Sequence, residues 1–283
     1  MQKITKTKRK KKNLLLNVLL GVFITAFLVF GGWLGYELYM DWQSQSYYTA
    51  LSASIETRPR VPGQPRPSVP AARPDNTGEE AEVNGADELE EHEEDDWLPY
   101  VDFEALDEVY PGIVGWIKLY NSALDYPIMQ TTNNHYFLGH LPDGTRHRSG
   151  SVFLDYRNSP DFSDKNSLLY GHESRTEDMF GALKNYRRQS FYEENPVMYI
   201  HTPEADFELV VFAAYLVDSG IESPTINFRD DEHFLEYIDR VRRRSFFQSD
   251  VVITAEDRIV SLCTCAYDYT NARFIVVGKL VEF

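Results

Sequence analysis

The sequence predicts a mainly β-structured domain, a barrel or a sandwich, behind an N-terminal membrane helix and an extended linker. An apolar run occupies residues 14–36, and a proline-rich and then acidic stretch follows it. Short apolar runs separated by turn residues fill the chain from residue 97 onward. Short β-rich runs at this spacing are typical of barrels and sandwiches rather than of parallel sheets.

The N-terminus has the pattern of a membrane anchor. Residues 1–12 form a basic tail, and the apolar run behind them matches the roughly 20 residues that cross a hydrocarbon core as a helix. We assign the transmembrane helix to residues 13–39, because aromatic residues gather at its far end. Basic residues precede the span and none follow closely, which predicts a cytoplasmic N-terminus and an extracellular domain. A cleaved signal peptide is the alternative, but its apolar core would be only ~7–15 residues long, and no A-x-A-like site is present.

Residues 40–96 have the composition of an extracellular linker. Residues 58–74 read RPRVPGQPRPSVPAARP, which is too rich in proline for a helix or a central strand. Residues 79–96 read EEAEVNGADELEEHEEDD, an acidic run that repels itself and has little to bury. This run inflates the formal net charge of −16, and it lacks the spacing of a calcium loop. We therefore expect a disordered tether that holds a folded domain away from the membrane.

Residues 97–283 are long enough to form one domain with a sizeable core. Helical spacing of apolar residues, with an acidic start and a basic end that complement the helix dipole, predicts a long helix within residues 229–247. Shorter helices are predicted at 102–110 and 177–186. The predicted strands cover residues 115–120, 149–156, 167–172, 197–202, 206–218, 258–265 and 272–283.

The chain holds only two cysteines, Cys263 and Cys265, and both lie in one predicted strand. Their side chains would face the same side, with Cα atoms roughly 6.6 Å apart at a rise of ~3.3 Å per residue. That separation is at the far edge of the disulfide range, so a bridge between them is disfavoured. Either both cysteines are buried small hydrophobic residues, or one of them is a nucleophile at the end of the strand.

The residues after Cys265 favour the nucleophile. A hairpin centred near Tyr269 sets Arg273 opposite Cys265, with Cβ atoms ~4.5–5.5 Å apart. A guanidinium at that place favours the thiolate and offers donors to an oxyanion or a substrate carbonyl. A general base must come from elsewhere, and we slightly prefer His172 to His140, because His172 ends an apolar strand and enters a polar loop. No H-E-x-x-H or similar spacing indicates a metal site.

These motifs resemble those of sortases, the membrane-anchored cysteine transpeptidases of Gram-positive bacteria. The sequence SLCTC, residues 261–265, is similar to the T-L-x-T-C signature of that family. Residues 166–186, NSLLYGHESRTEDMFGALKNY, are similar to the segment that carries its catalytic histidine. Residues 115–140 and 150–158, with the short spacing from the cysteine to the arginine, resemble class B. The resemblance extends over about residues 98–283.

The resemblance implies a closed eight-stranded β-barrel with a few peripheral helices and no cofactor. It implies that Cys265 attacks the carbonyl after threonine in a sorting signal and that His172 is the acid and base. Arg273 would bind the substrate and stabilise the oxyanion.

Further residues are candidates for substrate binding. The resemblance places Tyr170 in the lining of the substrate pocket and Thr264 beside the nucleophile. Cys263 occupies a position that is often serine and close to the substrate, and Ser261 replaces the usual first threonine of the signature. Thr225, in the loop before the long helix, is a candidate contact that would influence the preferred motif.

The implied partners are surface proteins with a C-terminal sorting signal, and an amine of a peptidoglycan precursor or cross-bridge. The N-terminal helix would hold the enzyme in the cell membrane, and nothing indicates nucleic acid. Three alternatives stay open. These are a pilin-polymerising sortase that uses a lysine amine, a secreted cysteine peptidase or amidase that uses water, and a non-enzymatic tethered β-domain with both cysteines buried.

Overall fold

The structure is a computed structural model that describes residues 2–53, 55–59, 97–120, 122–174, 177–218, 220, 224–265 and 272–283. Within these ranges, the side chains of residues 2–15, 56–59, 97–100 and 265 are outside the description. The chain divides into two compact units, residues 1–47 and 48–283. Each unit is described by itself.

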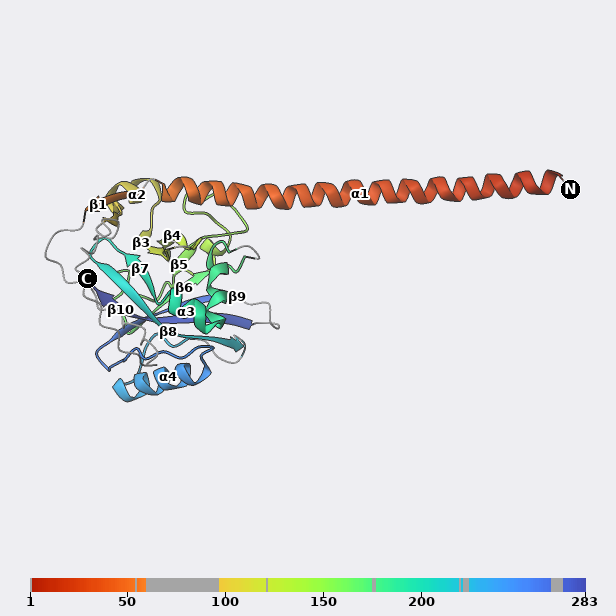
Figure 1. Ribbon diagram of the computed structural model, residues 1–283. Helices are drawn as coiled ribbons and strands as arrows, with labels where there is room; N and C mark the ends of the chain where they lie inside the picture. The colour runs from red at the N-terminus through yellow and green to blue at the C-terminus, as the bar shows by residue number, and fades with distance from the viewer. Residues whose placement is uncertain are drawn as a thin grey trace, which may run out of the picture. The chain divides into compact units, whose positions relative to one another are not determined.

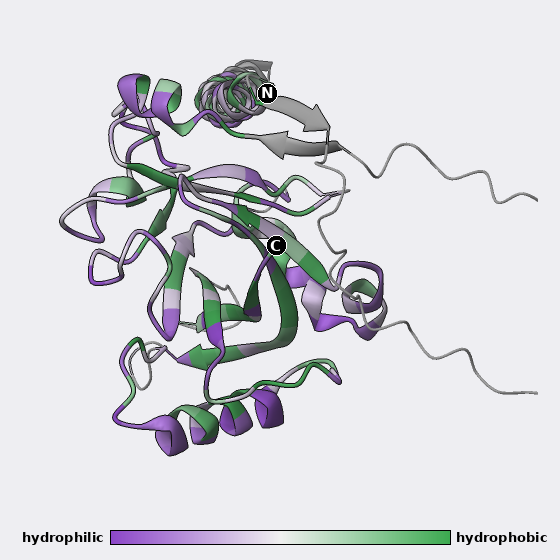
Figure 2. Cartoon of the chain, turned by 90° about the vertical axis from the view of Figure 1, so that its left-hand side faces the viewer, coloured by the Kyte–Doolittle hydropathy of each residue, from purple (hydrophilic) through white to green (hydrophobic). Residues whose placement is uncertain are grey.

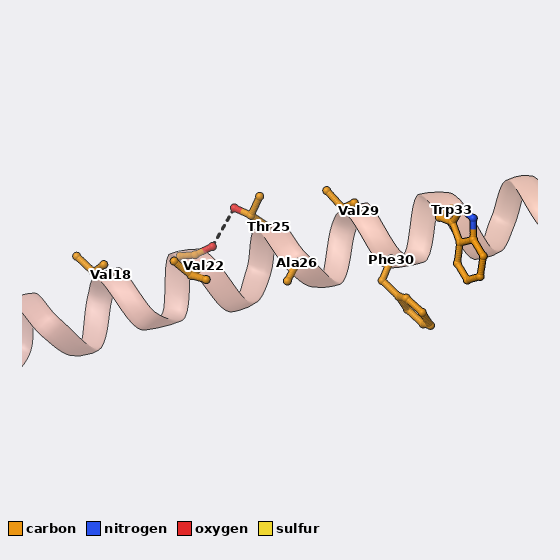
Figure 3. A pocket seen from close by; sticks show the side chains of 8 residues that line it. Val18, Val22, Thr25, Ala26, Val29, Phe30 and Trp33 are labelled. Carbon is orange, nitrogen blue, oxygen red and sulfur yellow. Dashed lines mark hydrogen bonds between the residues drawn. The ribbon is translucent and has the colours of Figure 1, made fainter.

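The first unit belongs to one long helix, α1 (Gln2–Ser52). Among the described residues, α1 alone is a helix long and apolar enough to cross a membrane. In the close view of its apolar surface, the Thr25 hydroxyl donates a hydrogen bond to the carbonyl of Gly21, with 2.9 Å between the oxygens (Figure 3). This bond satisfies the hydroxyl inside the helix, which lowers the cost of placing it among apolar groups.

The helix continues beyond the expected span at 13–39, so residues 40–52, which the sequence analysis placed in the linker, are helical. No proline or glycine interrupts this stretch. Its last turn belongs to the second unit, where the Tyr48 hydroxyl donates to the carbonyl of Gly150 at 2.6 Å and the Tyr48 ring packs edge-on against Tyr126. Burial of the ring raises the pKa of Tyr48. The end of the helix is therefore part of the folded domain.

Two short strands follow, β1 (Glu56–Pro59) and β2 (Trp97–Tyr100), and they pair antiparallel with Pro59 opposite Trp97. The segment between them, residues 60–96, lies outside the described residues, and so does most of the expected disordered tether. Its two described ends are nevertheless neighbours in one small sheet.

The second unit is built around a closed barrel of eight strands, as the sequence analysis expected. Around the barrel the order is β10-β8-β7-β3-β4-β5-β6-β9. The pairs β4–β5 and β6–β9 are parallel and the other pairs are antiparallel. The strands are β3 (Ile113–Lys118), β4 (Asp125–Met129), β5 (Val152–Leu154), β6 (Asn166–Gly171), β7 (Val197–His201), β8 (Asp206–Asp218), β9 (Arg258–Cys265) and β10 (Ala272–Glu282).

The seven predicted strands are present, and the eighth, β4, was missed. Pro127 lies inside β4, opposite Trp116 of β3, and a proline within a short apolar run argues against a strand in sequence patterns. The strand predicted at 149–156 is much shorter in the structure, since β5 covers only Val152–Leu154. Residues after β5 instead form a turn that carries polar side chains.

The second unit also contains helices and 3₁₀ turns between its strands. The predicted helices at 102–110 and 229–247 are confirmed as α2 (Phe103–Val109) and α4 (Asp231–Arg244). The predicted helix at 177–186 is instead a 3₁₀ helix, η3 (Phe180–Arg187), followed by α3 (Gln189–Glu194). A further 3₁₀ turn, η2 (Tyr136–Leu138), lies between β4 and β5.

Helix α4 packs along the outside of the barrel, beside β8 (Figure 1). The Asp230 side chain caps it by accepting from the backbone N–H of His233 at 2.8 Å. Hydrophilic and hydrophobic residues alternate along its turns (Figure 2). Its apolar residues form one cluster with β8, β9 and β10, and in this cluster Phe234 is fully buried.

We predict that Phe234→Ala lowers the free energy of unfolding by about 3–5 kcal/mol, because it leaves a cavity between α4 and the barrel. The neighbouring Leu235 is 38% exposed, and Leu235→Ala is the matched control, with a change below about 1 kcal/mol. Denaturant unfolding of both variants measures the difference. Equal losses would contradict the packing described for α4.

Candidate active site

The parallel pair β6–β9 brings two of the predicted site residues together. Gly171, the last residue of β6, lies opposite Thr264 of β9. His172 directly follows Gly171, and Cys265 directly follows Thr264. The backbones of His172 and Cys265 therefore leave the same pair of neighbours at the same edge of the barrel.

The antiparallel pair β9–β10 adds the third residue. Arg273 lies opposite Cys265, as the hairpin argument predicted. Residues 266–271 of the connecting turn and the Cys265 side chain are outside the described residues. The Arg273 guanidinium is half-buried and donates to the carbonyl of Ala272 at 3.1 Å. Cys265 therefore pairs with Arg273 on one side. On its other side, His172 follows the last residue of β6 that pairs with β9.

The imidazole of His172 is held by a backbone carbonyl. Its Nε2 lies 2.8 Å from the carbonyl oxygen of Leu138, the last residue of η2. Because a carbonyl oxygen only accepts, the hydrogen-bond network assigns a hydrogen to Nε2. On the backbone, the carbonyl of His172 accepts from Phe180 N at 3.1 Å. Nothing in the sequence marks Leu138 as part of the site, since a backbone carbonyl can belong to any residue type.

The other histidine that follows a glycine, His140, lies in a different setting. Its Nδ1 is 2.7 Å from the carbonyl oxygen of Tyr136, and its ring stacks on the Tyr136 ring with centroids 4.2 Å apart. His140 also forms a β-bridge with Arg146. His140 thus contacts Tyr136 and Arg146, whereas the backbone of His172 lies beside the end of β9; the preference for His172 stays a prediction.

A buried carboxylate, Asp155, lies behind the site. Its side chain is fully buried, and it accepts two hydrogen bonds from the Arg157 guanidinium at 2.8 and 2.9 Å. Asn134 Nδ2 donates to Asp155 Oδ2 at 2.9 Å, and the Tyr170 hydroxyl donates to the same oxygen at 3.2 Å. The predicted substrate-pocket residue Tyr170 is therefore fixed by a carboxylate that the sequence analysis did not identify.

These contacts shift the pKa values of the groups involved. Burial alone would raise the pKa of Asp155, but hydrogen bonds from Arg157 and Asn134 more than offset it, and the pKa is lower than usual. Burial, followed by the neighbouring Cys263 and Asp155, raises the pKa of Tyr170. At neutral pH, Asp155 is therefore an ionised carboxylate that accepts a hydrogen bond from the neutral hydroxyl of Tyr170.

The remaining predicted residues fall into two groups. Cys263 lies opposite Tyr170, is 4% exposed, and packs in the apolar cluster under α4, while Thr264 is also buried. Thr225 is not brought to the site. Its carbonyl accepts from Asn166 at the start of β6, whereas His172 follows the end of that strand.

Within the described residues, no group of three His, Cys, Asp or Glu side chains could hold a metal ion.

A sequence profile described as the sortase domain matches residues 117–281. Sortase B of Staphylococcus aureus is 36% identical over 182 residues, which cover 64% of this chain and 75% of that protein. The chain belongs to the sortase family, class B. Sortase B of Listeria monocytogenes is 33% identical over 178 residues, covering 62% of this chain and 72% of that protein.

Solved sortase structures share the fold. A complex of Staphylococcus aureus sortase B with substrate has a TM-score of 0.61 and 36% identity, and the match covers 64% of this chain and 84% of that chain. Sortase B of Bacillus anthracis in complex with AAEK2 has a TM-score of 0.60 and 32% identity, over 64% and 83% of the two chains. As a sortase, the protein is a membrane-associated cysteine transpeptidase that acts on proteins with sorting signals in cell-wall sorting. This excludes the non-enzymatic β-domain.

We predict that Gly171→Ala disturbs the site through packing. A Cβ at this position would lie 2.8 Å from Cγ of the fully buried Phe180. We expect a loss of about 1–3 kcal/mol in the free energy of unfolding and slower acylation of the enzyme by a sorting-signal peptide, because His172 is the next residue.

Gly139→Ala is the matched control, because Gly139 also precedes a histidine and a Cβ there would meet nothing within 4 Å. Unfolding and acylation rates of the two variants should differ clearly. If both variants behave like the wild type, the close approach of η3 to β6 does not constrain the site.

Proposed function

We propose that this sortase cleaves a C-terminal sorting signal after threonine and transfers the acyl group to an amine of peptidoglycan or its precursor. The observation that supports this best is the strand register that sets His172 beside the end of β9 and Arg273 opposite Cys265. A thiol, an imidazole and a guanidinium at one edge of a barrel provide a nucleophile, a proton carrier and an oxyanion ligand.

In the first half-reaction, the Cys265 thiolate attacks the threonine carbonyl carbon, and a carbon–sulfur bond forms. The negative charge that develops on the carbonyl oxygen is stabilised by the Arg273 guanidinium. The carbon–nitrogen bond then breaks, and His172 protonates the departing amine. The products are a thioester on the enzyme and the free C-terminal fragment of the substrate.

In the second half-reaction, the acceptor amine attacks the thioester carbonyl. His172, now neutral, takes a proton from the attacking amine, and the carbon–sulfur bond breaks to restore the thiolate. The new bond is an amide, so the step needs no cofactor. Because Nε2 of His172 already donates to Leu138, the proposal assigns the proton transfers to Nδ1.

We propose a single-pass topology with residues 1–12 in the cytoplasm, a membrane helix at 13–39, and the catalytic domain outside the cell. The basic tail before the helix and the absence of nearby basic residues after it support this orientation. We propose a linker at 40–96 and a catalytic domain at 97–283. The last turn of α1, at the start of the linker, packs with the folded unit. Substrate roles for Tyr170, Thr264, Cys263 and Thr225 stay predictions.

The nucleophile is tested by Cys265→Ala, which should abolish the covalent adduct with a sorting-signal peptide in intact-protein mass spectrometry. Cys263→Ser is the matched control, since it removes the neighbouring thiol, which lies buried in the α4 cluster, and should leave the adduct on Cys265. An adduct that persists in Cys265→Ala and disappears in Cys263→Ser would reverse the assignment.

The oxyanion role is tested by Arg273→Lys. Lysine keeps the positive charge but lacks the fork of donors, so we expect kcat/KM to fall about 100-fold or more. Arg243→Lys, at an exposed position in the last turn of α4, should leave kcat/KM close to wild type. An Arg273→Lys enzyme with normal kcat/KM would show that charge alone suffices.

A further inference from the structure

Asp155 is a saturated hydrogen-bond acceptor at the end of β5. It accepts from Nε and Nη2 of the Arg157 guanidinium and from the Arg157 backbone N–H. Asn134 and Tyr170 complete its partners. A carboxylate has about four lone-pair directions, so these donors leave it no capacity for a substrate. Its role must therefore lie in what its partners hold.

The first partner leads to the carbonyl that holds the His172 ring. Asn134 donates to Asp155 through Nδ2 and accepts from the backbone N–H of Tyr156 through Oδ1 at 3.0 Å. The preceding residue, Asn133, accepts from two backbone N–H groups at the start of η2. The turn that ends at Leu138 is thus fastened to Asp155 and its neighbour by one amide.

The second partner leads to the backbone that carries the imidazole. Tyr170 lies two residues before His172 on β6, and its hydroxyl bonds to Asp155 Oδ2. Its ring packs on Phe153, which pairs with it across β5 and β6. The chain that carries the imidazole and the turn that accepts its hydrogen bond therefore meet at one carboxylate.

We propose that Asp155 is a positioning residue for His172. Its carboxylate holds η2 and β6 at a fixed separation, so that the Leu138 carbonyl keeps the imidazole in one orientation. The inference rests on the proposed acid–base role of His172. A displacement of about 1 Å in a reacting group can cost about 100-fold in rate. The hydrogen bonds of Asp155 to Asn134 and Tyr170, called the brace below, can therefore affect the rate without contact with substrate.

The chemistry of the brace requires a carboxylate. An asparagine at position 155 would offer one acceptor oxygen and would turn an NH₂ group toward the donors of Arg157, Asn134 or Tyr170. At least one of these contacts must then open. Asn134→Ala removes the η2 side of the brace alone and leaves the Asp155–Arg157 ion pair in place, so it separates positioning from the stability of a buried pair.

The kinetic test compares Asp155→Asn and Asn134→Ala with Asp125→Asn in the full chain. Asp125 is the matched control, because it also accepts two side-chain hydrogen bonds, from Trp116 at 2.7 Å and Lys118 at 2.9 Å, on β3 and β4. We expect kcat for transfer from a sorting-signal peptide to triglycine to fall about 10- to 100-fold in the first two variants, with KM changed less than about 3-fold. Asp125→Asn should keep the wild-type kcat.

A second readout observes the His172 ring directly and needs no catalysis. In protein labelled with ¹⁵N-histidine, the Nε2–H of His172, assigned by its loss in His172→Ala, should give a downfield proton signal at low temperature in the wild type and in Asp125→Asn. In Asn134→Ala and Asp155→Asn the signal should shift or broaden as the hydrogen bond to Leu138 loosens.

The two readouts separate the possible outcomes. If kcat and the His172 signal of Asn134→Ala and Asp155→Asn match those of Asp125→Asn, the positioning role is wrong. Should Asp155→Asn fail to fold, Asn134→Ala decides by the same criteria. A wild-type enzyme that forms no Cys265 adduct would overturn the proposed function, while the ring signal would still test the brace.

Discussion

The parallel pairing of β6 with β9 is the constraint on which the site depends. These strands are separated by about 90 residues of sequence, yet their register sets Gly171 opposite Thr264 and thereby fixes where His172 and Cys265 leave the sheet. A slip of one residue would send every side chain of one strand to the other face. Strand β9 also pairs with β10, so the same strand sets the position of Arg273. Closure of the barrel leaves β9 no free edge at which to slip.

The packing on both faces of β9 holds the strand that ends at the proposed nucleophile. Val260 and Leu262 are fully buried on one face, and Ile259 and Cys263 pack under α4 on the other. The described side chains on both sides of β9 are thus buried as far as Thr264, and tight packing of this kind holds the strand in one position. Cys263 is buried in the cluster under α4, while Cys265, two positions on, is the last residue of β9 to pair with β10. Rigid strand ends and adjoining turns are a common place for catalytic groups.

Local patterns predicted much of this arrangement. The length of the turn between β9 and β10 predicted the pairing of Cys265 with Arg273, and the spacing of apolar residues predicted α4. Strand β4 was not predicted because it contains Pro127. The extension of α1 was not predicted because residues 40–52 were assigned to the linker by their position after the apolar run, although their composition is compatible with a helix. The Asp155 network could not be predicted, because its members come from segments near 134, 155 and 170 that only the closed barrel brings together. The carbonyl of Leu138 carries no residue-type signal at all.

The central claim is that a thiol, an imidazole and a guanidinium act on one carbonyl group at this edge of the barrel. A crystal structure of the enzyme with a sorting-signal peptide that ends in a threonine aldehyde, joined to Cys265 as a thiohemiacetal, tests it most directly. The account predicts that the Arg273 guanidinium lies within about 3 Å of the oxygen that represents the oxyanion, with the His172 ring on the leaving-group side. A peptide bound in a groove that neither side chain reaches would contradict it.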